Sequence, residues 1–181
     1  MISWLRPSSA HFDQVVRAYS SELFQYASWL SRDRHRAEDI LQDAFARAWK
    51  NWHQVNDEAG RRSWLYTIVR NEFLRDVGRL NSRQEEAEDD EPQDIADGAD
   101  FTIGVELRDV LARLPEKYLE PLLLQNLVGM SCAEIGAVMG LTAGATMTRL
   151  TRARLALHDL IQGNEAAARP ALRLVQTRGA R

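Results

Sequence analysis

The 181-residue sequence contains one cysteine, four histidines and no long hydrophobic run, and each scarcity argues against a class of protein. A single cysteine, Cys132, cannot form an internal disulfide, so we expect a reducing, cytoplasmic compartment. The scattered histidines form no metal-ligand spacing with this thiol, and we expect no metal site. No stretch approaches the roughly 20 apolar residues of a membrane helix, and the first residues are too weakly apolar for a signal peptide. We therefore expect neither secretion nor membrane insertion.

The sequence also lacks the patterns of catalysis. It has no phosphate-binding glycine loop and no nucleophile paired with a base. Nothing in the sequence around Glu38, Asp39 and Asp43 indicates an apolar pocket, which would be needed to shift the pKa values of a catalytic pair of carboxylates. We expect no catalytic residues, no cofactor and no enzymatic activity.

Charge is unevenly distributed along the chain, although the formal net charge is only −3. Residues 1–79 contain 12 basic against 10 acidic residues, residues 80–104 contain 1 against 9, and residues 105–181 contain 10 against 7. The acidic segment has few apolar residues and no helical period, which is typical of a disordered or loosely ordered linker. The sequence thus predicts two weakly basic lobes joined by an acidic linker.

Apolar residues recur with a period near 3.6, and no segment indicates a substantial β-strand. The expected helices cover residues 11–30, 34–51, 63–79, 104–114 and 116–128, followed by two helices beginning at 131 and 142. Asp33 is a candidate N-cap, and Pro115 suits a first helical turn. The predicted fold class is all-α with two small helical domains. The expected divisions are domains at 10–80 and 104–162, a linker at 81–103 and a disordered tail at 163–181.

The segment SCAEIGAVMGLTAGATMTRL, residues 131–150, has the pattern of a helix-turn-helix. Ser131 and Glu134 form an S-x-x-E capping box, Gly140 supplies the turn, and Thr142 caps the second helix. The inward stripe of that helix is Thr146, Leu150, Ala153 and Leu157. The outward residues are Gly144, Met147, Thr148, Thr151 and Arg152, with Arg149 flanking the inward stripe. Small residues at the start and arginines along the flanks suit the major groove, while a plain helical hairpin with solvated arginines is the alternative.

Three blocks in fixed order resemble one protein family. They are AEDILQDAFARAWKNW, RRSWLYTIVRNEFLRDVGR and LPEKYLEPLLLQNLVGMSCAEIGAVMGLTAGATMTRLTRARLAL. Together they resemble the extracytoplasmic function (ECF) group of bacterial sigma factors, sigma-70 family members that keep only regions 2 and 4. The resemblance covers most of residues 11–161. It implies a promoter-specificity subunit of RNA polymerase whose last lobe recognises the minus 35 element and whose first lobe recognises and helps melt the minus 10 element.

The resemblance also implies site residues. Residues implied to meet the β′ clamp helices of core polymerase are Asp39, Gln42 and Asp43, and the polymerase β flap is a further implied contact. Residues implied at the minus 10 element are Asn56, Arg61, Arg62, Asn71 and Arg75. Residues implied at the minus 35 element are Gly144, Met147, Thr148, Arg149, Thr151 and Arg152. Because charge on a helix is commonly just solvated, that alternative stands for the acidic face and for each arginine.

The sequence departs from the family pattern in both lobes, and the resemblance also implies a regulator. Val55 stands where similar proteins often have an aromatic residue, which argues against base stacking at the entrance of the minus 10 loop. Met147 stands where they often have a basic residue and Ala145 where they often have a threonine, so the minus 35 preference is expected to be unusual. Such factors are commonly inhibited by an anti-sigma factor, often membrane-anchored, that covers both lobes. A stand-alone helix-turn-helix repressor or activator is the alternative of a different class, and an adaptor that binds polymerase without DNA is another.

Overall fold

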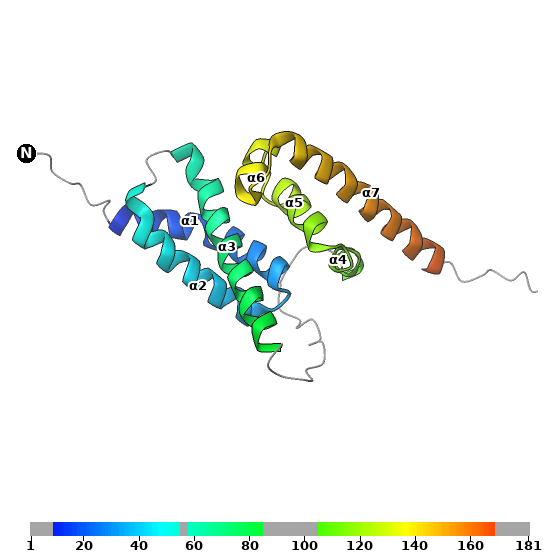
Figure 1. Ribbon diagram of the computed structural model, residues 1–181, viewed down its shortest axis with the longest axis horizontal. Coiled ribbons are helices and arrows are strands. Elements are labelled where there is room, and N and C mark those ends of the chain that lie inside the picture. The colour runs from blue at the N-terminus through cyan, green and yellow to red at the C-terminus, as the bar shows by residue number, and fades with distance from the viewer. Residues whose placement is uncertain (1–8, 55–57, 85–104, 169–181) are drawn as a thin grey trace, which may run out of the picture.

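The first lobe consists of three helices packed against one another (Figure 1). The structure is a computed structural model that describes residues 9–54, 58–84 and 105–168. Helix α1 spans Ser9–Ser31, α2 spans Arg34–Asn51 and α3 spans Glu58–Gln84, with a 3-10 turn at Trp52–Gln54 after α2. Fully or nearly fully buried residues at the centre of this lobe are Leu23, Tyr26, Ala27, Ala37, Ala48, Tyr66 and Val69.

The second lobe contains four helices. Helix α4 spans Val105–Ala112, α5 spans Glu116–Asn126, α6 spans Cys132–Met139 and α7 spans Ala143–Ala168. Its best-buried residues include Leu114, Leu119, Leu124, Ile135, Leu150 and Ala153. The all-α class is confirmed, since the described residues contain no strand.

Several expected boundaries were placed wrongly, and α3 shows the largest difference. It begins at Glu58 and reaches Gln84, whereas the local pattern predicts 63–79. Its first turn is anchored by tertiary contacts, because Arg62 pairs with Glu22 of α1 at 2.9 Å and Arg61 stacks over Trp52. Such contacts override the weak local propensity of a segment rich in turn residues. At its other end, α3 continues to Gln84, so residues 81–84 are helical.

The helix α7 is also longer than expected. It continues to Ala168, so residues 163–168, predicted as tail, are helical. The sequence NEAAA at this point explains the extension, because alanine and glutamate favour helix. In contrast, α4 and α5 end two residues earlier than predicted, at Ala112 and Asn126.

The corner between α1 and α2 follows the predicted capping. The amide of Arg32 donates to the Ser28 carbonyl at 2.9 Å. Arg32 itself adopts a left-handed conformation with φ of 55°, and this conformation ends α1. The Asp33 carboxylate then accepts a 3.0 Å hydrogen bond from the Arg36 amide. The predicted N-cap is thus confirmed, and it marks the start of α2.

Charged pairs between α2 and α3 fix the register of the first lobe. Arg36 donates to Asp76 at 2.7 Å. Glu72 is only 3% exposed and accepts from both Arg47 of α2 and Arg75 of α3. A buried carboxylate is tolerated only when it is paired, so this pairing constrains how α2 and α3 can pack.

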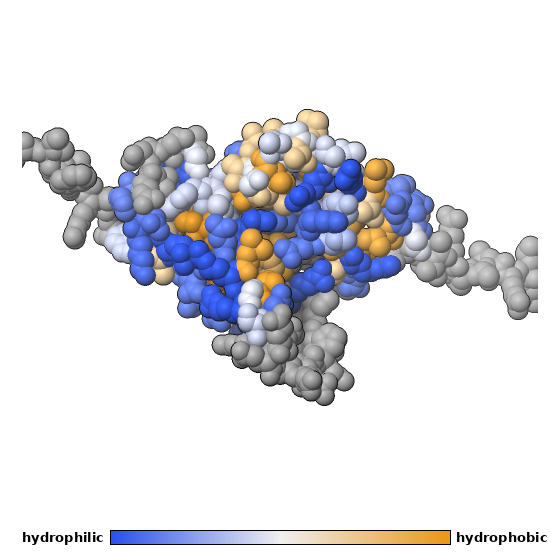
Figure 2. Space-filling model, in the orientation of Figure 1, coloured by the Kyte–Doolittle hydropathy of each residue, from blue (hydrophilic) through white to orange (hydrophobic). Residues whose placement is uncertain are grey.

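The two lobes touch along α3 and α6 and along α1 and α5 (Figure 1). Buried apolar residues from both lobes form one continuous cluster. On the face drawn in Figure 2, hydrophilic residues predominate and hydrophobic ones form small separate patches. The described protein therefore has one shared core, and the face drawn in Figure 2 is largely polar.

Candidate nucleic-acid interface

An acidic hollow lies on the first lobe between α2 and α3. Asp39, Gln42 and Asp43 are all exposed and point into it from α2. The remaining lining residues are Ile40, Glu72, Asp76 and Arg79. The hollow measures about 250 Å³, and Arg79 approaches Asp43 only loosely, at 3.9 Å. The three residues predicted from the family resemblance therefore lie together on one accessible surface, which we call the α2 acidic face.

The arginines predicted for the minus 10 element are already engaged within the first lobe. Arg62 is paired with Glu22, the Arg61 guanidinium lies 5.2 Å above the Trp52 ring, and Arg75 pairs with Glu72. Asn56, like Val55, lies outside the described residues. A DNA phosphate would have to share or displace the existing partners of these arginines, so single-strand contacts there carry a cost that spacing alone does not reveal.

Asn71 is exposed and continues, at helical spacing, a row of α3 residues whose earlier members face the second lobe. Gly60, Trp64, Thr67 and Asn71 recur at helical spacing, and the first three line a hollow of about 430 Å³. The opposite wall is formed by Ala133, Glu134 and Ala137 of α6. We call these four residues of α3 the α3 stripe. Half-buried Trp64 packs on the core and also borders this hollow.

The helix-turn-helix is formed by α6 and α7, and its predicted caps are confirmed. The Ser131 hydroxyl accepts from the Glu134 amide at 3.3 Å, while the Glu134 carboxylate accepts from the Ser131 amide at 2.8 Å. Gly140 has φ of 67°, a left-handed conformation that favours glycine. Thr142 then accepts from the Ala145 amide at 3.2 Å and begins α7.

The two faces of α7 are also as predicted. Thr146, Leu150 and Ala153 are at most 1% exposed and pack inward. The exposed residues are Gly144, Met147, Thr148, Thr151 and Arg152, and Arg149 is half-buried. This exposed set forms the recognition surface of α7, with Met147 its most prominent apolar side chain at 62% exposure.

The threonines of the recognition surface have a restricted hydrogen-bonding role. Thr148 Oγ1 donates to the Gly144 carbonyl and Thr151 Oγ1 donates to the Met147 carbonyl, each at 3.0 Å. Their hydroxyl protons are therefore used within α7. What these side chains offer to a major groove is a methyl group and oxygen lone pairs.

Replacing Ser131 with alanine is expected to lower the free energy of unfolding by about 1 kcal/mol at neutral pH, because the capping box is lost. Hydrogen bonds from the Ser131 hydroxyl and then its amide lower the pKa of Glu134 below its usual value. A lowered folded-state pKa gives a stabilisation present above the unfolded-state pKa and lost as pH falls through the folded one. Denaturant titrations of wild type and Ser131→Ala near neutral pH and near pH 3 measure both effects.

The control for this prediction is Glu134→Gln, which retains a capping-box side chain but cannot ionise. Its stability should lack the acid-dependent contribution. A difference between wild type and Ser131→Ala that stays constant down to acid pH would contradict the assigned role of Glu134.

Three structurally important residues have no sequence signal of their own. Glu120 is 2% exposed and bonds to residues of the first lobe, although its position in α5 is locally that of an ordinary amphipathic glutamate. Glu72 neutralises two arginines. A Cβ added to Gly136 would lie 2.6 Å from the Leu141 carbonyl oxygen. Only the three-dimensional packing reveals these roles.

Two protein-family models match this chain, one in each lobe. The sigma-70 region 2 model matches residues 15–89, which contain the α2 acidic face and the α3 stripe. The sigma-70 region 4 model matches residues 104–157, which contain the helix-turn-helix. The two matches cover more than half of the chain.

Curated relatives are similar over most of this chain. The ECF RNA polymerase sigma factor SigM of Mycobacterium tuberculosis is 32% identical over 155 residues, covering 83% of this chain and 76% of the relative. SigM of Bacillus subtilis is 28% identical over 154 residues, covering 82% and 93%. SigE of Mycolicibacterium smegmatis is 30% identical over 161 residues, and the match covers 83% of this chain but only 61% of that relative.

Solved structures share the fold. A sigma factor RpoE, in complex with the anti-sigma factor NepR from Bartonella quintana, has a TM-score of 0.73 at 24% identity, covering 84% of this chain and 97% of that one. CnrH, in complex with the cytosolic domain of CnrY, has a TM-score of 0.66 at 26% identity, covering 87% and 92%. A region 2 lobe followed by a region 4 helix-turn-helix lobe is the architecture of a sigma-70-type specificity subunit. This chain belongs to the ECF sigma factors of the sigma-70 family.

Two other features are absent from the described residues. No group of three or more histidine, cysteine, aspartate or glutamate side chains there could hold a metal ion. Within the same ranges, no helix is long and apolar enough to cross a membrane.

Proposed function

We propose that this protein binds core RNA polymerase and directs transcription from promoters that carry a minus 35 and a minus 10 element. The observation that carries the proposal is the pairing of sigma regions 2 and 4 in one chain, and the exposure of the α2 acidic face and of the α7 recognition surface supports it. Such a protein supplies specificity, and bond formation belongs to the polymerase, so the protein itself is not an enzyme. Because it acts with the transcription machinery, its place is the cytoplasm.

The first lobe is proposed to hold the polymerase and the minus 10 element. Asp39, Gln42 and Asp43 would contact the β′ clamp helices through the α2 acidic face, which is accessible and lined mainly by polar groups. Asn71 would bond to the edge of an unpaired base, since an exposed amide offers both a donor and an acceptor. Asn56, Arg61, Arg62 and Arg75 are proposed to extend this contact along the single strand.

The second lobe is proposed to read the minus 35 element with α7. Small residues at the start of the helix permit close approach to the major groove. Arg149 and Arg152 would supply phosphate contacts that position the helix, while the exposed side chains of Met147, Thr148 and Thr151 would face the bases. The polymerase β flap is a further proposed partner of this lobe.

An anti-sigma factor is the proposed regulator. The support comes from two structures whose folds match over most of this chain. RpoE was determined in complex with the anti-sigma factor NepR, and CnrH in complex with the cytosolic domain of CnrY. Such a partner would act by covering the surfaces of both lobes.

Transcription by purified core polymerase on genomic DNA, with and without this protein, tests the proposal. We expect new transcript 5′ ends that share a two-part upstream motif. If an active core polymerase and folded protein yield no new starts, the sigma function is wrong, and a stand-alone repressor or activator becomes the better explanation.

The double variant Arg149→Ala, Arg152→Ala separates a sigma factor from a polymerase adaptor. It should weaken transcription from the new starts and reduce the dependence of promoter binding on salt by about one phosphate contact per arginine. Its core polymerase affinity should match wild type. Unchanged promoter activity would support an adaptor that does not touch DNA.

A further inference from the structure

Three side chains connect the lobes where α1, α3 and α5 meet. The Tyr26 hydroxyl of α1 donates to Glu120 Oε1 of α5 at 2.8 Å. Arg70 Nε of α3 donates to the same oxygen at 2.6 Å. Burial, and then the Glu120 carboxylate, raises the pKa of Tyr26 well above its usual value, so its hydroxyl keeps the proton it donates. We call Tyr26, Arg70 and Glu120 the interlobe triad.

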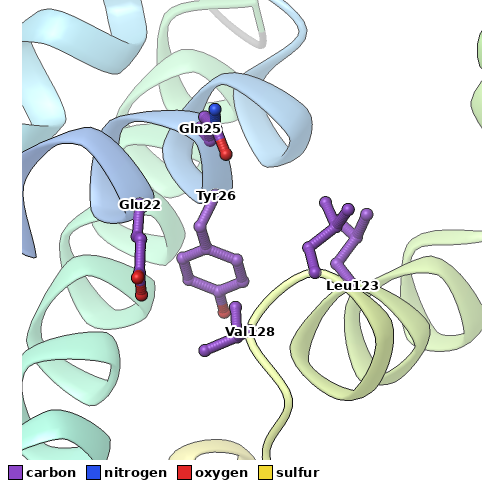
Figure 3. Close-up of a pocket in the computed structure, with 6 residues that line it drawn as sticks. Glu22, Gln25, Tyr26, Leu123 and Val128 are labelled. Atoms are coloured by element: carbon purple, nitrogen blue, oxygen red, sulfur yellow. The ribbon is translucent and has the colours of Figure 1, made fainter. Parts of the chain in front are cut away.

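The triad is enclosed by tightly packed side chains. Tyr26 and Glu120 are each 2% exposed, and the Arg70 side chain is 20% exposed. Figure 3 shows the Tyr26 ring extending from α1 towards Val128, with Leu123 of α5 nearby. The space left here is about 10 Å³, which holds about one water molecule. Around Tyr26, the contact between the lobes therefore has room for no more than about one water molecule.

Apolar burial favours contact between the lobes, and the triad selects the geometry of that contact. The shared core removes apolar surface of both lobes from water, which drives association without defining orientation. The Glu120 carboxylate can be buried only where Tyr26 and Arg70 meet it. Removing one partner leaves an uncompensated charge in the closed arrangement alone, because water would solvate that charge once the lobes separate.

The closed arrangement places α6 opposite the first part of the α3 stripe, whereas Asn71 stays exposed. Gly60, Trp64 and Thr67 of the α3 stripe face α6 across the 430 Å³ hollow, and Asn71 continues the same stripe. Arg70 of the triad is the neighbour of Asn71 in sequence. A single DNA strand laid along the α3 stripe would meet the second lobe.

We propose that the interlobe triad is a latch that holds the free protein closed, with α6 of the second lobe facing Gly60, Trp64 and Thr67 of the α3 stripe. The consequence for transcription rests on the function proposed above, whereas the closure itself does not. Binding to polymerase then requires the latch to open, and the observed affinity is the intrinsic affinity reduced by the fraction of open molecules.

The distances of a promoter support separation of the lobes in the working state. The two elements are named for positions about 25 base pairs apart, or roughly 85 Å at about 3.4 Å per base pair. In the closed form the lobes are within hydrogen-bonding distance, and α7, with 26 residues, is only about 39 Å long. Residues 85–104 provide 20 residues of connecting chain, which can span about 70 Å at most. Chain length thus permits the lobes to separate.

Energy transfer between two dyes tests the latch in the full-length protein. The dyes are placed on exposed helices of the two lobes, using Lys50→Cys and His158→Cys in a Cys132→Ser background. Arg70→Met and Glu120→Gln each remove one side of the charge pair, and Glu120→Gln does so with little change in shape. We expect high transfer in the parent protein and a clear loss in both variants, accompanied by at least a tenfold gain in affinity for core polymerase. Circular dichroism shows whether the helices remain folded.

Glu38→Gln is the matched control, because it makes the same chemical change in an exposed pair with Arg34 at 3.1 Å within one lobe. It should leave energy transfer unchanged. Low transfer in the parent, or unchanged transfer in both folded triad variants, would overturn the latch. Open variants with unaltered polymerase affinity would overturn its inhibitory role. If no form binds polymerase, the proposed function fails, while the transfer measurement still decides whether the triad closes the lobes.

Discussion

A Gly136→Ala variant is expected to lose about 2 to 3 kcal/mol of folding stability, although it adds only one methyl group. The added Cβ would lie 2.6 Å from the Leu141 carbonyl oxygen and 3.2 Å from Thr146 Oγ1. Neither neighbour can yield easily, because Leu141 bonds through its amide to the Gly136 carbonyl at 2.8 Å and Thr146 is fully buried. Relief requires α6 and α7 to move apart, so the variant should also lose minus 35 binding.

Thermal unfolding followed by circular dichroism measures this effect, and we expect a fall in Tm of roughly 5 to 10 °C. Gly163→Ala in α7 is the matched control, since nothing lies within 4 Å of its added Cβ. That control should gain up to about 1 kcal/mol, because alanine favours helix over glycine. Equal stability of Gly136→Ala and wild type would show that the turn is more adaptable than its close contact implies.

Reversing charge on the α2 acidic face is expected to weaken core polymerase binding by at least tenfold, or about 1.4 kcal/mol. The double variant Asp39→Lys, Asp43→Lys places two cations where carboxylates are proposed to meet the β′ clamp helices. Both side chains are exposed, so the helix content and melting temperature should change little. A binding titration with labelled protein and core polymerase measures the loss.

A second double variant separates a local contact from a general effect of charge. Asp13→Lys, Asp109→Lys makes the same change in net charge at exposed positions on α1 and α4. Its polymerase affinity should remain near wild type. If both double variants bind equally well, the α2 acidic face is not part of the interface.

Local signals in the sequence predicted much of the fold and one surface of the site. Asp33, Ser131 and Thr142 were each identified as caps from residue type and position, and the structure contains each of these hydrogen bonds. Periodicity separated the buried residues of α7 from its exposed recognition surface. These features depend on neighbours within about one helical turn, which is the range that a sequence pattern can report.

Features that depend on distant neighbours could not be predicted in this way. Tyr26 and Glu120 lie 94 residues apart, and nothing in their local spacing indicates that they meet. The early start of α3 depends on Glu22 and Trp52, which lie outside that helix. Arginines assigned to DNA from the resemblance turned out to have protein partners, because local spacing does not show which carboxylate or ring lies nearby.

The continuous apolar cluster has a consequence for cooperativity. In the closed form each lobe completes the other, so the described helices should melt as a single unit rather than as two. Once separated, each lobe is a domain of roughly 65 to 75 residues, a size at which an isolated core gives only marginal stability. When the lobes separate, each therefore loses the stability that it gains from the other, and binding to another surface must replace that stability.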